Sequence, residues 1–159
     1  VQFRNTATLG GSVYGRFGFS DVLTVLLALN ASVELYKGGI VPLAQFAEMP
    51  FDRDILVRVH IPKENAAFFY QSVRPTRTDF PALTCAAARL AGGAYRFAVG
   101  ARPGRAVGLT PQCTLGELPE IVSAQVTTGS NLRGSAAYRR HLIRVLVRRA
   151  VDELEGGAK

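Results

Sequence analysis

The sequence predicts an α+β fold in which mixed and antiparallel sheets pack with helices. Period-two alternation, as in residues 54–61, indicates strands, and helical periodicity, as in residues 135–154, indicates helices. The two kinds of segment do not follow one another as regular strand–helix–strand units, which excludes a Rossmann repeat. With 159 residues, 48% of them hydrophobic, the chain can bury a genuine core in one or two compact units.

The first part of the chain predicts a buried helix followed by short strands. Ser20 is a favourable N-cap residue, and residues 21–29 are apolar on nearly every side, which is typical of a helix enclosed by other elements. That helix is expected to end near Asn30. The elements after it are, in order, a strand over residues 32–36, a turn at 37–39, an extended segment over 40–43 and a short helical turn over 44–46.

A strand over residues 54–61 closes this part. Its alternation assigns Ile55, Val57, Val59 and Ile61 to the core, and Leu56, Arg58 and His60 to the opposite face. The composition changes after Pro62. We therefore expect a boundary between two subdomains at residues 63–65.

The second part predicts further strands and three helices. A strand over residues 67–73 and a loop over 75–78 precede an expected helix over 80–90, in which Pro81 is tolerated because N–H groups of the first turn lack partners. The remaining elements are strands over 94–100 and 106–110, a helix over 114–125, and a long helix over 135–154 that ends at Gly156-Gly157. The apolar stripe of this last helix comprises Tyr138, Leu142, Val145, Leu146 and Val151.

The chain is basic, with a formal net charge of +7. Much of the excess falls in the last helix, in Arg139, Arg140, Arg144, Arg148 and Arg149. Three of these repeat every four residues and form one stripe. We expect a solvated or partner-facing flank, because no aromatic residues interleave with the arginines to stack on bases. Nucleic acid is therefore not the expected partner.

Cys85 and Cys113 are too few for a disulfide framework, a zinc site or an iron–sulfur site. They are expected to be buried or incidental thiols of a cytoplasmic protein. The longest apolar run, residues 22–33, is shorter than the roughly 20 residues that span a membrane. We therefore expect no membrane association, and any iron–sulfur cluster must lie on another polypeptide.

A glycine pair near the start is the strongest functional signal. The segment Arg4-Asn5-Thr6-Ala7-Thr8-Leu9-Gly10-Gly11-Ser12 places two glycines among hydroxyl side chains, and Asp21 follows at the head of the apolar helix. Adjacent glycines let the backbone approach a phosphate and direct N–H groups at it. A glycine pair also occurs in ordinary turns, so the surrounding residues decide.

The segment resembles the T-I/L-G-G-N signature of the FAD-binding subunits of molybdenum hydroxylases, the family of xanthine dehydrogenase, carbon monoxide dehydrogenase and 4-hydroxybenzoyl-CoA reductase. Three later segments, in the same order as in that family, carry the resemblance further. They are Asp54-Ile55-Leu56-Val57-Arg58-Val59-His60-Ile61-Pro62, Phe69-Tyr70-Gln71-Ser72-Val73-Arg74, and Arg133-Gly134-Ser135-Ala136-Ala137-Tyr138-Arg139-Arg140-His141-Leu142.

The resemblance implies the C-terminal part of a PCMH-type FAD-binding domain, followed by a three-stranded antiparallel sheet with helices. Residues 1–62 would be the second FAD-binding subdomain, with the N-terminal subdomain and its glycine-rich loop absent from this chain, and residues 63–159 the C-terminal domain. The implied function is an FAD-bearing, electron-transferring oxidoreductase subunit. The molybdenum cofactor and 2Fe-2S clusters would lie on partner chains, namely a molybdopterin subunit and an iron–sulfur subunit.

Cofactor contacts carry over position by position. The resemblance assigns them to Thr6, Thr8, Leu9, Gly10, Gly11, Ser12, Asp21, Leu56 and Tyr70. Ser12 replaces the commoner asparagine, and Leu56 corresponds to an apolar residue beside the flavin ring. Tyr70 stands where xanthine dehydrogenases carry a lysine, and a tyrosine can stack or donate a hydrogen bond but cannot supply a fixed positive charge.

No hydrolase or metalloenzyme pattern is present in the sequence. His60 and His141 lie in different elements without a neighbouring carboxylate or cysteine pattern, which favours a surface or structural role. One alternative function stays open: a non-catalytic docking domain whose basic C-terminal helix binds a partner subunit or nucleic acid. The substrate and the terminal electron acceptor cannot be derived from these residues.

Overall fold

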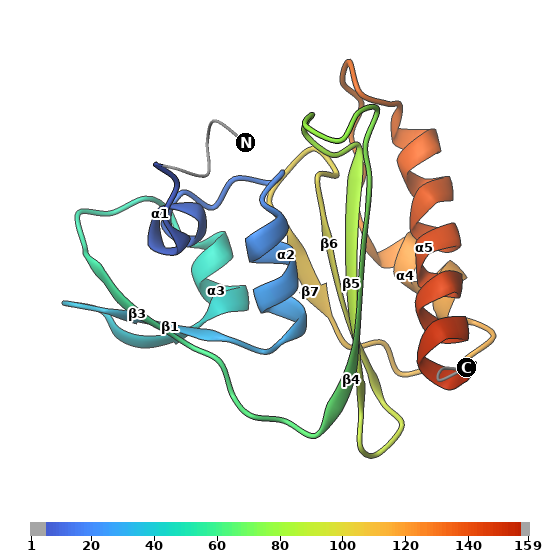
Figure 1. Cartoon of the computed structure of the whole chain (residues 1–159), viewed down its shortest axis with the longest axis horizontal. Helices are drawn as coiled ribbons and strands as arrows, with labels where there is room; N and C mark the ends of the chain where they lie inside the picture. The colour runs from blue at the N-terminus through green and yellow to red at the C-terminus, as the bar shows by residue number, and fades with distance from the viewer. Residues whose placement is uncertain (1–5, 157–159) are drawn as a thin grey trace.

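A computed structural model describes residues 6–156 of the chain. Within this range there are five helices and seven strands, and the strands form two antiparallel sheets (Figure 1). The α+β class predicted from the sequence is confirmed. Arg4 and Asn5 of the glycine-pair segment and Gly157 of the expected stop lie outside the described residues.

The first half of the chain builds a three-stranded sheet with three short helices. In order, the elements are α1 (Leu9–Tyr14), α2 (Asp21–Ala28), β1 (Ser32–Leu35), β2 (Gly39–Pro42), α3 (Leu43–Glu48) and β3 (Leu56–His60). The strand order is β2-β1-β3. As predicted, Ser20 caps α2: its hydroxyl accepts a hydrogen bond from the amide of Leu23 at 3.2 Å. Gly39, in the predicted turn, adopts a positive φ of 67°.

The predicted faces of β3 hold at Arg58, Val59 and His60 but are wrong at Leu56 and Val57, because the strand contains a bulge. Leu56 pairs with Leu35 and Arg58 pairs with Glu34, so Val57 is an extra residue opposite the β1 strand. A bulge shifts the alternation by one position. Leu56 and Val59 consequently face the core. Ile55, Val57 and Ile61, which the alternation assigned to the core, are exposed.

The second half builds a four-stranded sheet with two helices. The elements are β4 (Ala66–Val73), β5 (Leu83–Leu90), β6 (Tyr95–Gly100), β7 (Val107–Leu109), α4 (Leu118–Gln125) and α5 (Ala136–Gly156). The strand order is β4-β5-β6-β7, all antiparallel. The sheet therefore has one strand more than the three that the resemblance implied.

The additional strand is β5, where the sequence predicts a helix over residues 80–90. This prediction is wrong. A short apolar run fits a buried helix and a buried strand equally well, and here it pairs with a neighbour on each side. Its small side chains serve both faces: Ala87 belongs to the core under α5, and Ala86 to the core under α2.

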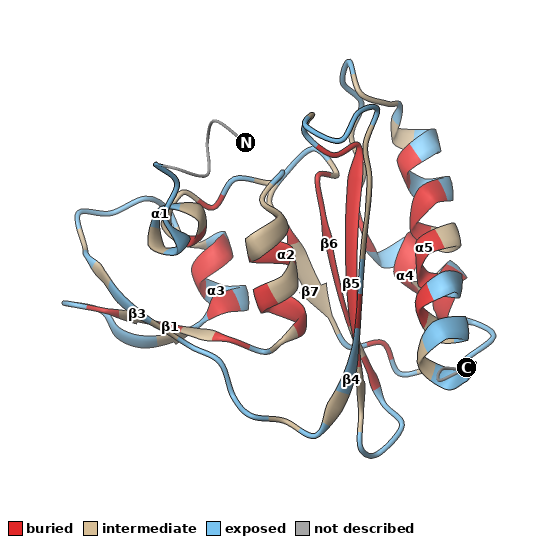
Figure 2. Ribbon diagram, in the orientation of Figure 1, coloured by how far each residue is buried: buried red, intermediate tan, exposed pale blue. Residues whose placement is uncertain are grey.

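Helices cover both faces of this sheet, as Figure 1 shows. α4 and α5 pack on one face, and α2 packs on the other, between the two sheets. Figure 2 shows β5 and β6 buried along most of their length and α5 buried along the side that faces them. Pro62–Asn65, the expected subdomain boundary, joins β3 to β4.

One arginine of the expected basic flank of α5 is buried instead. Arg139 is fully enclosed, and its guanidinium donates to the carbonyl oxygens of Ala82 (2.8 Å), Ala101 (3.1 Å) and Gly129 (2.8 Å). It also donates to Gly134 and to the side chain of Asn131. Carbonyls in this buried region need donors, and a five-donor side chain supplies them. Tyr138, assigned to the apolar stripe, is exposed.

Candidate functional site

The glycine pair lies in the first turn of helix α1. The backbone of Thr8 is extended, and its hydroxyl accepts a hydrogen bond from the amide of Gly11 at 3.0 Å, so Thr8 is the N-cap residue. Neither Gly10 nor Gly11 has a positive φ, so the bend expected from the sequence is a helix start. Gly11 is exposed and Gly10 is half-buried, and neither lies in the hydrophobic interior.

A side chain would be crowded at Gly11 but not at Gly10. A Cβ atom on Gly11 would lie 3.0 Å from the capping hydroxyl of Thr8, and one on Gly10 would face the Cδ2 atom of Leu56 at 4.0 Å. The first amides of a helix have no acceptor within the helix. Among the described residues, Thr8 supplies an acceptor for Gly11 and nothing accepts from Leu9 or Gly10.

The structure brings Leu56 next to this turn. Leu56 is half-buried at the start of β3, packed against the core that includes β1 and α2, and its side chain faces Gly10. Thr6 and Thr8 are exposed beside it. Ser12, by contrast, uses its hydroxyl within the helix, where it donates to the carbonyl oxygen of Thr8 at 3.0 Å.

Asp21 and Tyr70, which are distant in sequence, meet at the start of α2. The hydroxyl of Tyr70 donates to Oδ1 of Asp21 at 2.5 Å, and Nη2 of Arg74 approaches both carboxylate oxygens at 2.5 Å. Burial, and then the hydrogen bond to Asp21, raise the pKa of the Tyr70 hydroxyl above its ordinary value. Tyr70 is therefore a hydrogen-bond donor at every physiological pH.

A small apolar hollow adjoins this cluster. It has a volume of about 140 Å³ and is lined by Val25, Ala28, Leu29, Phe68, Phe69, Tyr70 and Ala86. Tyr70 is the only predicted cofactor residue among these lining residues. The side chains of Phe68 and Tyr70 are both partly open to solvent beside α2. This hollow can accept an apolar or aromatic group next to a polar cluster.

A family comparison assigns the first part of the chain. The profile of the family described as the FAD binding domain in molybdopterin dehydrogenase matches residues 1–64. The match covers the first 64 of the 159 residues. The match ends within the Pro62–Asn65 segment that joins the two sheets and includes eight of the nine predicted cofactor residues, all except Tyr70.

Two curated relatives extend over almost the whole chain. The uncharacterized protein YgfM of Escherichia coli strain K12 is 28% identical over 148 residues, covering 91% of this chain and 57% of YgfM. The glyceraldehyde dehydrogenase medium chain of Sulfolobus acidocaldarius is 26% identical over 178 residues, covering 97% of this chain and 63% of the relative. The chain thus spans about three fifths of the length of these relatives.

Solved structures show the same fold. A chain of quinoline 2-oxidoreductase from Pseudomonas putida 86 superposes with a TM-score of 0.81 at 23% identity, covering 99% of this chain and 64% of that chain. A chain of CO dehydrogenase from Oligotropha carboxidovorans superposes with a TM-score of 0.82 at 19% identity and the same coverage. Both sheets and the helices around them therefore belong to one known architecture.

Arg74 was not predicted from the sequence as part of this site. Its side chain is 23% exposed and holds both oxygens of Asp21. It also donates to the carbonyl oxygen of Asp79 at 3.0 Å. Arg74 lies four residues after Tyr70, directly after the end of β4, in a segment that carries the family resemblance, and extended backbone with this spacing directs both side chains to the same side.

Several other expectations concern residues outside this site. Cys85 is buried, and burial raises the pKa of its thiol to about 12, while Cys113 is half-buried. His60 lies 3.1 Å from Glu34 on the outer side of the first sheet. Between residues 6 and 156 no cluster of His, Cys, Asp or Glu could hold a metal ion. No helix in that range is long and apolar enough to cross a membrane.

Proposed function

We propose that this chain is the FAD-binding, electron-transferring part of a molybdenum-dependent hydroxylase or dehydrogenase in the cytoplasm. Electrons would pass from iron–sulfur centres through the flavin to an acceptor. The partners would be an iron–sulfur subunit, a molybdopterin subunit and an upstream FAD-binding segment. The observation that carries the proposal is the match of residues 1–64 to the model of the FAD binding domain in molybdopterin dehydrogenase.

The residues present fit a flavin dinucleotide in chemical type. The amides of Leu9 and Gly10 and the hydroxyls of Thr6 and Thr8 would donate to its anionic diphosphate. Asp21 would accept from a hydroxyl group, since it keeps acceptor capacity beyond Tyr70 and Arg74. When bound, FAD supplies the redox chemistry, while the protein positions it and sets its electrostatics.

Two side chains would set the environment of the flavin ring. Leu56 would contribute an apolar surface beside the glycine turn. Tyr70 would contribute a hydrogen-bond donor that stays protonated. In place of a lysine it brings no positive charge, which supports an acceptor other than the NAD of the xanthine dehydrogenases. In the subdomain division proposed with this function, residues 1–62 form the second FAD-binding subdomain and residues 63–159 form the C-terminal domain.

A visible absorption spectrum tests the proposal. The chain is produced together with its upstream FAD-binding segment, purified and scanned for flavin bands. Gly10→Asp and Gly11→Asp are expected to abolish the bands, because each adds a side chain and a negative charge where the diphosphate would lie. Gly92→Asp is the matched control, since a Cβ there meets nothing within 4 Å. Colourless wild-type protein, with folding verified by circular dichroism, would contradict the proposal.

The alternative function rests on the exposed arginines of α5. Arg140, Arg148 and Arg149 are exposed on the helix surface, whereas Arg144 pairs with Glu120 at 2.6 Å. A docking domain would bind a partner through them without any cofactor. Salt-sensitive binding of a polynucleotide by colourless protein, lost in Arg140→Gln and Arg148→Gln together, would favour this alternative over flavin binding.

A further inference from the structure

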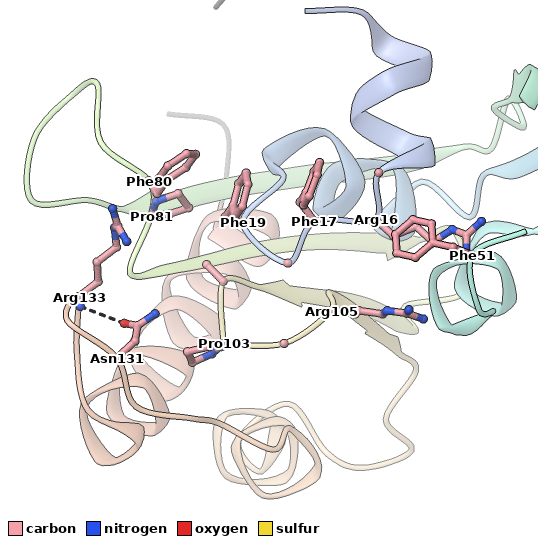
Figure 3. Close-up of a pocket in the computed structure, with 14 residues that line it drawn as sticks. Arg16, Phe17, Phe19, Phe51, Phe80, Pro81, Pro103, Arg105, Asn131 and Arg133 are labelled. Atoms are coloured by element: carbon pink, nitrogen blue, oxygen red, sulfur yellow. Dashed lines mark hydrogen bonds between the residues drawn. The ribbon is translucent and has the colours of Figure 1, made fainter.

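A second cavity is lined by none of the predicted cofactor residues. It has a volume of about 510 Å³, within the range of small-molecule sites, which is about 300–1,000 Å³. Five segments line it: the turn between α1 and α2, the start of the loop after α3, the stretch before β5, the loop after β6, and the loop before α5. Figure 3 shows the lining side chains of this aromatic cavity.

A row of phenylalanine rings forms one wall of the aromatic cavity (Figure 3). Phe17 and Phe19 are stacked, with centroids 5.2 Å apart and an angle of 9° between the ring planes. Phe19 in turn lies 4.3 Å from Phe80. All three rings are exposed to a large extent, between 41% and 54%. Phe19 and Phe80 are tilted by 48°. Exposed rings that pack in a row offer a surface on which a flat aromatic group can lie.

Guanidinium groups lie at both ends of this wall. Arg133 is placed over the Phe80 ring at 5.2 Å, and Arg105 lies 5.9 Å from the ring of Phe51 at the other end. Arg16 lies over the same Phe51 ring at 4.8 Å. None of the described lining residues is Asp or Glu. The cavity therefore carries positive charge at its ends and an apolar middle.

Two of these arginines have donors without partners. Arg16 is only 2% exposed, and within residues 6–156 its Nε and Nη2 atoms have no hydrogen-bond acceptor, although Nη1 donates to the carbonyl oxygens of Met49 and Pro50. The buried Nε of Arg133 likewise lacks an acceptor among these residues, while its Nη2 donates to Asp79 at 3.0 Å. Buried donors are normally satisfied, so these nitrogens remain open to an acceptor from a bound ligand.

We propose that the aromatic cavity binds a planar aromatic carboxylate. The ring would lie along Phe17, Phe19 and Phe80, and the carboxylate would accept from an arginine at one end. Guanidinium groups match carboxylates in geometry and in charge. Neutral aromatic compounds would leave the arginine donors unsatisfied, and aliphatic acids would leave the phenylalanine wall uncovered.

This site is separate from the proposed flavin site. None of the residues predicted to contact FAD lines the aromatic cavity. Failure of flavin binding would therefore leave the proposal intact, and the reverse also holds.

Isothermal titration of the full chain with 1-naphthoate tests the site. We expect saturable binding of one molecule per chain. The neutral 1-naphthamide and the non-aromatic cyclohexanecarboxylate should each bind about tenfold more weakly, since one lacks the charge and the other lacks the ring. Equal binding of 1-naphthoate and 1-naphthamide would overturn the proposal, because it would show an apolar groove without recognition of the anion.

Variants assign the binding to this cavity. Arg133→Met and Phe17→Ala are each expected to weaken 1-naphthoate binding about fivefold or more, and Arg133→Lys should retain part of the affinity. Arg148→Met, which removes an exposed arginine of α5 far from the cavity, is the matched control and should bind like the wild type. Circular dichroism verifies folding. No saturable binding to the wild type, or equal affinity in all variants, would overturn the assignment.

Discussion

The hydroxyl of Tyr70 lies 2.5 Å from Oδ1 of Asp21, although 49 residues separate the two in the chain. Arg74, directly after the end of β4, approaches the same carboxylate, also at 2.5 Å to each oxygen. The first turn of α2 is thereby tied to the edge strand of the second sheet. Among the described residues, Asp21 and Tyr70 are the only two predicted cofactor residues whose side chains hydrogen-bond to each other.

We expect this contact to control flavin affinity. Asp21→Ala should weaken FAD binding about 10- to 100-fold, because a charged acceptor is lost, and Tyr70→Phe should weaken it about 2- to 10-fold, because the ring stays and one hydrogen bond is lost. Quenching of flavin fluorescence during titration, in the chain combined with its upstream segment, measures both. Asp152→Ala, an exposed residue of α5, is the control. Unchanged affinity in Asp21→Ala would remove Asp21 from the flavin site.

Arg139 is expected to dominate the stability of the second half. Arg139→Met should lower the free energy of unfolding by about 3 kcal/mol or more, because several buried carbonyl oxygens lose their donor at once. Its neighbour Arg140 is exposed, and Arg140→Met should change stability by less than about 0.5 kcal/mol. Urea unfolding followed by circular dichroism compares the two variants. Equal stability of the two variants would show that water molecules donate to these carbonyl oxygens in place of Arg139.

Gly18 is expected to tolerate no side chain. A Cβ atom there would collide with the carbonyl group of Gly104, lying 2.7 Å from its carbon, and both partners are backbone. Gly18→Ala should therefore cost about 1–3 kcal/mol in thermal or urea unfolding. Gly92→Ala, at a position with open space, should be neutral or slightly stabilising. A neutral Gly18→Ala would mean that the loop after β6 moves freely.

Alkaline pH is expected to destabilise the fold. Tyr95 is buried and donates to Glu155 at 2.8 Å, and its burial, followed by that carboxylate, raises the pKa of its hydroxyl to about 12. The unfolded chain loses this proton near pH 10, so above that pH it binds fewer protons than the folded chain, and the free energy of unfolding falls as pH rises. Cys85, whose buried thiol has a pKa of about 12, acts in the same direction from pH 9 upward.

Urea unfolding between pH 8 and pH 11.5 measures this dependence. Tyr95→Phe removes one of the titrating groups, so its decline should be shallower than that of the wild type by about 1–2 kcal/mol over this range. Tyr36→Phe, at a side chain that is 74% exposed, is the matched variant and should follow the wild-type curve. Parallel curves for the wild type and Tyr95→Phe would refute the role of Tyr95.

Local signals in the sequence predicted much of the fold. Ser20 with the apolar run behind it defined α2, and the strand patterns on either side of Arg102–Gly104 predicted β6 and its neighbour β7. Such elements depend on caps, turns and alternation within about ten residues. β5 does not, because its small apolar residues fit a helix equally well, and only the strands that pair with it on both sides decide the outcome.

Features that depend on distant partners could not be predicted. The bulge at Val57 shows only when the register against β1 is known, and it changed the faces assigned to Leu56 and Val57. Arg139 stands among four other arginines of the same helix, and nothing local distinguishes it from the exposed ones. The resemblance placed Asp21 and Tyr70 at one cofactor, whereas their direct contact and the part of Arg74 depend on how α2 meets β4.

The position of α2 makes the two halves of the chain mutually dependent. Its residues Leu23 and Leu27 share one core with Ala86 of β5 and Ala98 of β6, so an element from before the Pro62–Asn65 segment shields a sheet from after it. Cutting the backbone within that segment would leave each fragment with an exposed apolar surface. Heating should accordingly melt the molecule in a single cooperative event, and neither fragment is expected to survive long on its own.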